Sequence, residues 1–330
     1  MIKNLLPFLL LLFAFTACSK KEYIRNEGFI FGTSYHIIYE SDKNLEQEIL
    51  IRLQQFNKSL NTYDSASIIS RINRNDTTVT VDSFFITCFN KAKEVSEITD
   101  GSFDMTVAPI VNAWGFGFNE TESVDSNLID SLMQFVGFHK ITLNGNKIYK
   151  LKKGVMLDAS AIAKGYGVDV VAELLENYGL NNYMVEIGGE VKAKGINPKG
   201  KFWQIGIDKP IDDVTASNRE LQAIVGLNNK SLATSGNYRQ FYVKNGIKYS
   251  HTINPKTGYP ARNNLLSSSV LTGNCMTADA FATAFMVLGV DKSIELANKL
   301  NYIDVYFIYS DSTGKYKTYA SDGFKKILKK

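Results

Sequence analysis

Apolar and polar residues recur along the chain with two different periods, and each period predicts a different kind of element. A helical spacing marks the stretch 45–60, whose apolar positions are Leu45, Ile49, Leu53 and Phe56. Residues 83–99 carry the same amphipathic pattern, and further helices are expected over 158–179 and 277–289. The polar segment 61–73 is expected to turn and then enter a short helix capped by Asp64 or Ser65.

Strand-like stretches are more numerous, and several follow one another directly. Asn245-Gly246 is a strong type I′ turn signal between two alternating runs, so a hairpin is expected there. Residues 101–117 are apolar and Gly-rich, and no regular element is expected in them. The expected strands are 28–40 with an irregularity at Gly32, 155–157, 182–195, 202–208, 221–227, 239–253, 265–273, 304–310 and one near 317–328. Strands without intervening helices predict an α+β fold, with a mostly antiparallel sheet core flanked by helices.

The first residues form a separate apolar segment with the features of a secretory signal. Lys3 supplies a positive charge, and the apolar run from Leu5 to Phe15 is too short for a permanent membrane anchor. The ending Phe-Thr-Ala-Cys resembles a bacterial lipobox, so we expect residues 1–17 to be removed and Cys18 to be lipidated. An ordinary signal peptide cut nearby is the alternative. Either signal predicts a periplasmic protein, and the lipobox adds a membrane anchor, in the inner or the outer membrane.

The remaining chain, 28–330, is expected to fold as one domain on a short tether, residues 18–27. Beyond the signal segment no run approaches the ~20 apolar residues needed to span a bilayer. The formal net charge is +4 and the charges are interspersed, which argues against a nucleic-acid partner. Cys88 and Cys275 lie far apart in apolar stretches, so buried thiols are favoured over a disulfide, and that choice stays open.

One candidate site begins at Asp158. This residue stands at a predicted strand end, and small residues and the start of a helix follow it. Small side chains let a ligand approach the backbone, and a helix N-terminus offers N–H groups to an anion. Lys164 falls about one and a half turns further on, within reach of the same ligand. The structural alternative is an Asp N-cap followed by a surface lysine.

A second candidate site is the pair Asp279 and Thr283. Residues four apart share one helical face, and the intervening Ala278, Ala280 and Ala282 leave room beside the backbone. A carboxylate, a hydroxyl and a carbonyl are hard oxygen ligands that suit Mg²⁺. The structural alternative is an Asp near an N-cap and a Thr that faces the core.

His251 is one of three histidines in the chain. Extending the predicted hairpin places it opposite Gln240, where the chain turns through Asn254-Pro255 and Gly258-Tyr259-Pro260. An imidazole accepts a proton near neutral pH, which suits a general base. Taken alone, a histidine at a strand end is more often structural.

Aromatic and Gly-rich segments form a last group of candidates, in which flat rings and open backbone could hold a planar ligand. They are Phe31, Tyr63, the run Ser102, Phe103 and Asp104, and the segment Trp114–Phe116. Core packing is the alternative reading.

These motifs also follow one another in a specific order. The order is F-G-T, L-N-T-Y-D-S-A-S-I-I-S-R-I-N, G-S-F-D-M-T-V-A-P-I-V-N-A-W-G-F-G, L-D-A-S-A-I-A-K-G, I-G-G-E, H-T-I-N-P-K-T-G-Y-P and T-A-D-A-F-A-T-A. Over about residues 28–325 the chain resembles the ApbE family, the FAD:protein FMN transferases. The resemblance implies a T-fold-related architecture, FAD as substrate and Mg²⁺ as cofactor. It also implies transfer of FMN through a phosphoester bond to a threonine of a partner flavoprotein, with release of AMP.

The resemblance implies roles for individual residues as well. The metal would be bound by Asp279, Thr283 and main-chain oxygens of Ala161 and Ala282. Asp158 and Lys164 would lie at the FAD, with Lys164 near the phosphates, and His251 would take the proton of the acceptor hydroxyl. The flavin or adenine pocket would be lined by Phe31, Tyr63, Ser102, Phe103, Asp104 and Ile253. Phe31 stands where many members have Met, and Ser160 lies where many have Gly.

Other functions remain open beside FMN transfer. The same residues would serve a Mg²⁺-dependent FAD pyrophosphatase that yields FMN and AMP, and a non-catalytic flavin-binding lipoprotein is a third reading. The expected partners are acceptor flavoproteins with an Asp-x-x-Ser/Thr-Gly-Ala-Thr-like motif, among membrane redox subunits. The chain carries no such motif itself, so we do not expect self-flavinylation.

Overall fold

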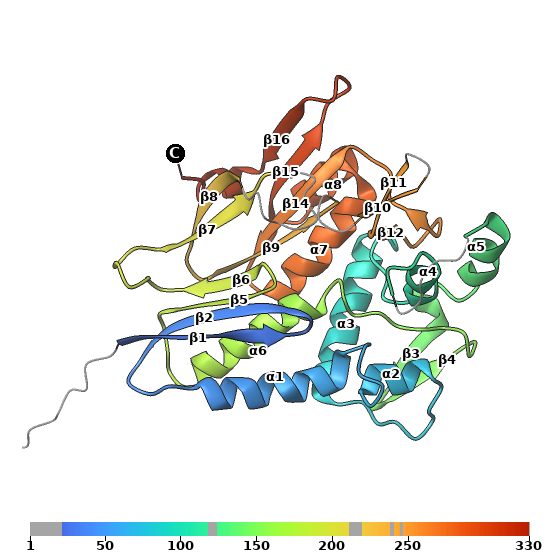
Figure 1. The fold of residues 1–330 in the computed structure, drawn as a ribbon, viewed down its shortest axis with the longest axis horizontal. Coiled ribbons are helices and arrows are strands. Elements are labelled where there is room, and N and C mark those ends of the chain that lie inside the picture. Colours follow the sequence, from blue (N-terminus) through green and yellow to red (C-terminus); the bar gives the residue numbers. More distant parts are fainter. Residues whose placement is uncertain (1–21, 118–123, 211–219, 238–240, 245–246, 330) are drawn as a thin grey trace, which may run out of the picture.

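The computed structural model describes residues 22–117, 124–210, 220–237, 241–244 and 247–329 (Figure 1). An eight-stranded sheet runs through it in the order β1-β2-β5-β6-β9-β14-β15-β16, and every neighbouring pair is antiparallel. Its strands are β1 Glu22–Ile30, β2 Thr33–Ser41, β5 Tyr183–Ile187, β6 Glu190–Lys194, β9 Lys230–Gly236, β14 Leu265–Thr272, β15 Asp304–Ser310 and β16 Tyr316–Ala320. The predicted α+β fold with a mostly antiparallel sheet is therefore confirmed.

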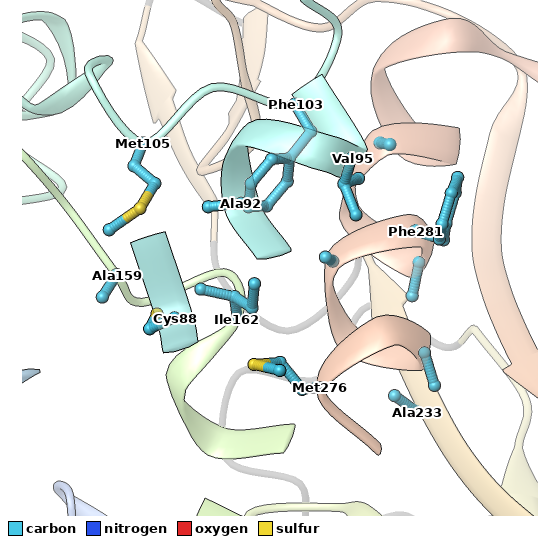
Figure 2. Packing of buried hydrophobic residues seen from close by; sticks show 14 of the residues in the cluster. Cys88, Ala92, Val95, Phe103, Met105, Ala159, Ile162, Ala233, Met276 and Phe281 are labelled. Carbon is cyan, nitrogen blue, oxygen red and sulfur yellow. The ribbon is translucent and has the colours of Figure 1, made fainter. Parts of the chain in front are cut away.

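Helices cover one face of the sheet. Two of them pack directly on its middle, with α6 over β5 and β6 and α7 over β9 and β14 (Figure 1). Figure 2 shows part of this core, where Val95 of α3 lies beside α7 and Cys88 lies near Ala159 and Ile162. The helices of this layer are α1 Glu46–Leu60, α2 Ile68–Asn73, α3 Ser83–Ile98, α6 Ala163–Asn177, α7 Cys275–Leu288 and α8 Val290–Lys299.

The other face of the sheet is covered by a hairpin and a short helix, namely β7 Trp203–Asp208, β8 Leu221–Leu227 and α9 Asp322–Lys325. Successive strand residues point to opposite faces. Val270 and Phe307 accordingly belong to the core under α7, whereas Leu271 and Tyr306 belong to the core under the hairpin. The middle of the sheet, from β6 to β15, is thus buried on both faces.

Short elements complete the molecule at one end (Figure 1). They are α4 Ala108–Ala113, α5 Ser126–Met133, the 3₁₀ turn η1 Phe138–Lys140, β3 Ile141–Asn144, β4 Lys147–Lys150, β10 Phe241–Lys244, β11 Ile247–Ser250, β12 Ile253–Asn254 and β13 Tyr259–Pro260. We call the cluster of Ile110, Trp114, Ile129, Val136 and Ile253 the minor core. It is the support for the segment that follows His251.

The expectation of one strand over 28–40 is wrong, and so is part of the predicted tether. The chain reverses at Phe31 and Gly32, whose φ angles are both positive (54° and 75°), and this turn separates β1 from β2. Strand β1 begins at Glu22, and its residues up to Glu27 pair with β2, so they belong to the domain. Residues 1–21, with the expected signal peptide and Cys18, lie outside the described residues.

Several other expected elements also differ from the structure. Residues 101–117 contain the helix α4, which accepts a proline in its first turn because the N–H groups there have no intrahelical partner. Residues 155–157 form a single bridge from Met156 to Val107 rather than a strand. The cap of α2 is Ser67, whose side chain accepts the Ser70 N–H. Helix α6 starts at 163 rather than 158, and the last predicted strand ends at 320 before α9.

The predicted 239–253 hairpin is confirmed by β10 and β11, which pair Phe241 with Ser250. Gln240 and the Asn245-Gly246 turn lie outside the described residues. Cys88 and Cys275 are both buried free thiols, as expected. Within the described part of the chain, no helix is long and apolar enough to cross a membrane.

Candidate active site at the junction of α6 and α7

Helices α6 and α7 approach each other closely, and Gly165 makes this approach possible. A side chain at Gly165 would bring its Cβ to 2.4 Å from the Cys275 carbonyl oxygen and 2.7 Å from the Asp279 Cβ. Because no side chain is present, the Gly165 N–H donates to Asp279 Oδ2 at 2.9 Å. Asp279 is only 2% exposed, so this bond fixes one oxygen of a buried carboxylate.

Lys164 lies between two buried carboxylates that come from different elements. Its Nζ is 3.1 Å from Glu190 Oε1 at the start of β6 and 4.0 Å from Asp279 Oδ1 on α7. Burial acts to lower the pKa of Lys164, but the charges of Asp279 and Glu190 outweigh it and raise that pKa. Burial raises the pKa of Glu190 to about 8, although the charge of Lys164 acts to lower it. The lysine therefore stays an ammonium ion at neutral pH.

A two-glycine turn between β5 and β6 positions the lysine stem. Ile187 pairs with Glu190, and the two residues between them have positive φ angles of 63° and 100°, as a tight hairpin requires. A Cβ on Gly188 would lie 2.8 Å from Thr33 Cγ2 and 3.2 Å from Lys164 Cδ. The absence of a side chain thus lets the lysine stem run along the backbone of the turn.

Thr283 lies one helical turn after Asp279, on the same face of α7 as predicted. Its Oγ1 is 3.2 Å from the Ser235 Oγ on β9. Ala282 is fully buried in the core. Its carbonyl lies within α7, where backbone carbonyls accept hydrogen bonds from the N–H four residues later. Asp279 Oδ1 and Thr283 Oγ1 are therefore the two side-chain oxygens that α7 offers here.

The Ala161 carbonyl lies just before α6, whose N-cap is Ile162. The Gly165 N–H belongs to the first turn, where N–H groups have no intrahelical partner, and it donates to Asp279. The Tyr166 N–H donates to the Ile162 carbonyl and forms the first bond of the helix. Among the backbone bonds of the described residues, none is made to the Ala161 oxygen.

The segment before α6 holds Asp158 close to Tyr63. The Asp158 N–H donates to the Met105 carbonyl at 2.7 Å, and its Oδ1 accepts the Ser160 N–H at 2.8 Å. Burial raises the pKa of Asp158. Partial burial and the charge of Asp158 raise the pKa of Tyr63, whose side chain is nevertheless 71% exposed. An exposed ring thus stands beside a carboxyl group at the entrance to α6.

Asn73 ties this segment to α2. Its amide nitrogen donates to the Leu157 carbonyl at 2.8 Å, and its oxygen accepts the Leu157 N–H at 2.7 Å. Both bonds cross to the residue directly before Asp158. These two bonds hold the extended stretch before Asp158 in place.

Phe31 occupies a strained turn above α6. Its φ of 54° is unusual for a residue with a bulky side chain, and such outliers concentrate at functional sites. The ring lies 5.2 Å from the ring of Phe56, and a Cβ on Gly167 would reach to 2.8 Å from it. Phe31 and Thr33 therefore border the same junction as Lys164.

The run Ser102–Asp104 is packed inward. Phe103 is 3% exposed and belongs to the main core (Figure 2). Asp104 Oδ1 accepts from the N–H and the hydroxyl of Thr106, and its Oδ2 accepts the Phe138 N–H at 3.0 Å. The Met105 carbonyl, next in the chain, accepts the Asp158 N–H and so joins this run to Asp158.

His251 lies at the end of the β10–β11 hairpin, partly exposed, with its ring 6.5 Å from that of Phe116. The Thr252 hydroxyl donates to the Asn237 side chain at 3.3 Å, just beyond the end of β9. Since β9 also carries Ser235, the contact partner of Thr283, the histidine segment connects to the α7 site through one strand.

The turn after His251 is fixed to the minor core. Ile253 is buried there, and the Trp114 indole N–H donates to the Gly258 carbonyl at 2.8 Å. Gly258 has a φ of 74°, which suits glycine, and its N–H returns to the Asn254 carbonyl. The Pro- and Gly-rich stretch therefore forms a rigid turn, as its sequence suggests. A pocket of about 480 Å³ opens beside it, against the C-terminal end of α7.

Comparisons with known proteins give this geometry a family. The model of the ApbE family matches residues 31–307. The chain belongs to the ApbE family. It is 40% identical to the FAD:protein FMN transferase of Haemophilus influenzae, over 94% of this chain and 93% of that one. The corresponding protein of Vibrio cholerae is 37% identical over the full length of both. The solved structure of the flavin transferase ApbE from Vibrio cholerae superposes with a TM-score of 0.83 at 36% identity, covering 93% of this chain and all of that one.

In this ApbE-family chain, the predicted site residues fall into four groups. Lys164, Asp279 and Thr283 are brought together, with Phe31 above Lys164 and Ala161 before α6. Tyr63 and Asp158 form a second group at the entrance to α6, and His251 stands on its own turn. The members whose side chains are buried in cores are Phe103, Ile253 and Ala282.

Three residues of the site were not predicted. Glu190 contacts Lys164, Ser235 contacts Thr283 and Asn73 holds the segment before Asp158. The sequence offers one indication of the position of Glu190. Gly-Gly in a strand-rich region predicts a tight hairpin, and Glu190 follows it directly, at the end of that hairpin. Ser235 and Asn73 carry no comparable local signal.

The oxygen atoms at the junction fit a divalent cation with hard-ligand preference. They are Asp279 Oδ1, Thr283 Oγ1 and the Ala161 carbonyl, which accepts no backbone hydrogen bond from the described residues. Among the described residues there is no group of three or more His, Cys, Asp or Glu side chains that could hold a metal. A cation here would therefore take its remaining ligands from water or substrate oxygens, as Mg²⁺ commonly does.

Proposed function

We propose that this ApbE-family enzyme transfers FMN from FAD to a threonine side chain of a partner flavoprotein and releases AMP, in a Mg²⁺-dependent reaction. The names of its relatives support the coarser statement, that it is a transferase acting with FAD on protein. The observation that carries the finer proposal is the α6–α7 junction, where the Lys164 ammonium lies 4.0 Å from Asp279 Oδ1, and Thr283 follows Asp279 by one turn on the same helix face. Such a set suits a pyrophosphate with its counter-ion.

Phosphoryl transfer needs positioning and charge neutralisation more than covalent help from the protein. Lys164 places its ammonium group at the first turn of α6, where it can pair with a phosphate oxygen. Mg²⁺ held by Asp279, Thr283 and the Ala161 carbonyl would neutralise further charge on the pyrophosphate. Phe31 and the exposed ring of Tyr63 border the junction and offer flat surfaces to a nucleotide ring.

His251 is the proposed base. The acceptor hydroxyl forms a new O–P bond to the FMN phosphorus, the bond from that phosphorus to the AMP oxygen breaks, and the hydroxyl proton passes to the imidazole. The histidine is partly exposed at the end of a hairpin, so a protein substrate can reach it. It stands on a turn that is separate from the elements around Lys164, which suits a group that meets the second substrate.

The test is direct incubation of the purified full-length protein in detergent with FAD, Mg²⁺ and a peptide carrying the acceptor motif. We expect a mass gain on the threonine that corresponds to FMN, with one AMP per modified peptide. Free FMN and AMP without peptide modification would indicate FAD hydrolysis instead. Intact FAD that stays bound regardless of Mg²⁺ would indicate a flavin-binding protein, and either result would refute the transfer proposal.

We further propose that the enzyme acts in the bacterial periplasm as a lipoprotein anchored through Cys18, on membrane-associated flavoproteins. The support is the sequence of the first eighteen residues, with its short apolar run and Phe-Thr-Ala-Cys ending. Replacing Cys18 with serine should move the protein from the membrane fraction to the soluble periplasmic fraction. Unchanged membrane association of Cys18→Ser would contradict the anchor.

A further inference from the structure

Glu190 is almost completely enclosed, yet only one of its two oxygens has a partner. Its side chain is 5% exposed, and Oε1 lies 3.1 Å from Lys164 Nζ. Oε2 is buried and accepts no hydrogen bond. A buried carboxylate with a single partner lowers the stability of the fold, so stability does not explain why Glu190 lies there.

The geometry around Lys164 supplies that reason. The ammonium is closer to Glu190 than to Asp279, by 3.1 Å against 4.0 Å. The Gly188 backbone borders the lysine stem on the same side as Glu190, since both belong to one hairpin turn. Lys164 is thus held toward β6, and its contact with Asp279 Oδ1 is the longer of its two ion pairs.

We propose that Glu190 is a positioning residue that keeps Lys164 from neutralising Asp279, so that the aspartate oxygen is available to a divalent cation. The inference rests on the cation site of the proposed function. Without the charge on Glu190, Lys164 has one carboxylate left to pair with, and it moves onto Asp279. A protein ammonium and the cation then compete for the same oxygen.

The formal charges of these three groups predict how each variant changes the affinity for the cation. With Glu190 ionised, Asp279, Glu190 and Lys164 together carry one net negative charge. Glu190→Gln brings the group to neutrality, while Glu190→Gln combined with Lys164→Met returns it to one negative charge. Supporting residues behind a metal ligand typically change metal affinity by roughly 10–100-fold. We expect the single variant to lose affinity in that range and the double variant to recover most of the loss.

The experiment measures Mn²⁺ binding to the full-length protein in detergent by electron paramagnetic resonance, without FAD. Glu190→Gln should bind Mn²⁺ roughly 10-fold or more weakly than wild type. The double variant should bind within about threefold of wild type, and Lys164→Met alone should bind more tightly. The matched control is Glu186→Gln in the same hairpin, where the native carboxylate accepts the Gly189 N–H at 2.6 Å and faces His36. It should bind as wild type does.

Three results would overturn the inference. A double variant as weak as Glu190→Gln would mean that Glu190 acts on the cation itself or on folding. Equal losses in Glu186→Gln and Glu190→Gln would mean that the hairpin acts only as structure. Absence of Mn²⁺ binding by wild type would remove the cation site. FMN transfer by wild type is scored separately, so a failed transfer assay with an intact charge cycle refutes the proposed function alone.

Discussion

Replacing Gly165 with alanine would test whether the close approach of α6 and α7 builds the site. The added methyl carbon would meet the Cys275 carbonyl oxygen at 2.4 Å and the Asp279 Cβ at 2.7 Å, both far inside normal contact. Neither neighbour is the end of a flexible side chain, because the first is helix backbone and the second is the root of a buried aspartate. The helices must therefore separate by several tenths of an ångström or more.

The cost follows from two terms of known size. Overpacking a closely packed contact costs about 1–3 kcal/mol. Separation also stretches the 2.9 Å bond from the Gly165 N–H to Asp279, and hydrogen bonds to charged groups are worth about 1.5–3 kcal/mol. Alanine regains about 1 kcal/mol through its higher helix propensity. We expect Gly165→Ala to lose about 2–4 kcal/mol of unfolding free energy and, because Asp279 shifts, roughly 100-fold in FMN transfer.

Two measurements check this prediction, urea unfolding followed by circular dichroism and the mass-spectrometric transfer assay. Gly273→Ala is the matched control, since nothing lies within 4 Å of the Cβ position at Gly273 and its φ is not in the left-handed region. That variant should unfold and transfer as wild type does. Gly165→Ala behaving like Gly273→Ala in both assays would refute the role of the helix contact.

Three further predictions concern other parts of the molecule. His251→Ala should keep FAD affinity and lose roughly 10²–10⁴-fold in transfer, measured by flavin titration and initial rates; unchanged transfer would exclude it as the base. Trp114→Phe removes the donor to the Gly258 carbonyl and should cost about 1–3 kcal/mol in urea unfolding; no loss would show that this bond does not hold the turn. Burial lowers the pKa of Lys150 to about 8, against about 10.4 unfolded. Between pH 8 and 10 the folded chain then binds fewer protons than the unfolded chain, so the lysine's contribution to unfolding free energy rises with pH. Lys150→Met should lack this rise, and parallel urea curves for both proteins at each pH would contradict it.

The fold class could be predicted because long amphipathic stretches and consecutive strands are strong local signals. The helix over 83–99 agrees with α3 almost residue for residue. The turn at Phe31 could not be predicted, because a bulky residue at positive φ is locally unfavourable and only packing against Phe56 and α6 stabilises it. Helix α4 was missed because six residues are too few for a periodic pattern to emerge.

The site was predictable where its geometry is local. Asp279 and Thr283 share a face because they are four residues apart on one helix, and this needs no tertiary information. Glu190 reaches Lys164 only because a hairpin and a helix meet, and Asn73 bonds to Leu157 across 84 positions of sequence. Single-sequence patterns do not encode such pairs. The buried Phe103 shows the converse, since an aromatic residue beside glycine has the same letters in a pocket as in a core.

The site is also divided between two separately packed parts of the molecule, and this division has a kinetic consequence. Lys164 and Asp279 are held by the α6–α7 contact in the main body, whereas the turn after His251 is anchored through Ile253 to the minor core. The described polar contacts of the His251 turn with the main body include the 3.3 Å bond from the Thr252 hydroxyl to the Asn237 side chain and the exposed ion pair between Lys256 and Asp100. A loosened minor core would therefore move the base without displacing the groups that face the phosphates. Changes in the minor core should accordingly lower kcat while leaving the KM for FAD nearly unchanged, whereas changes at the helix contact should alter both.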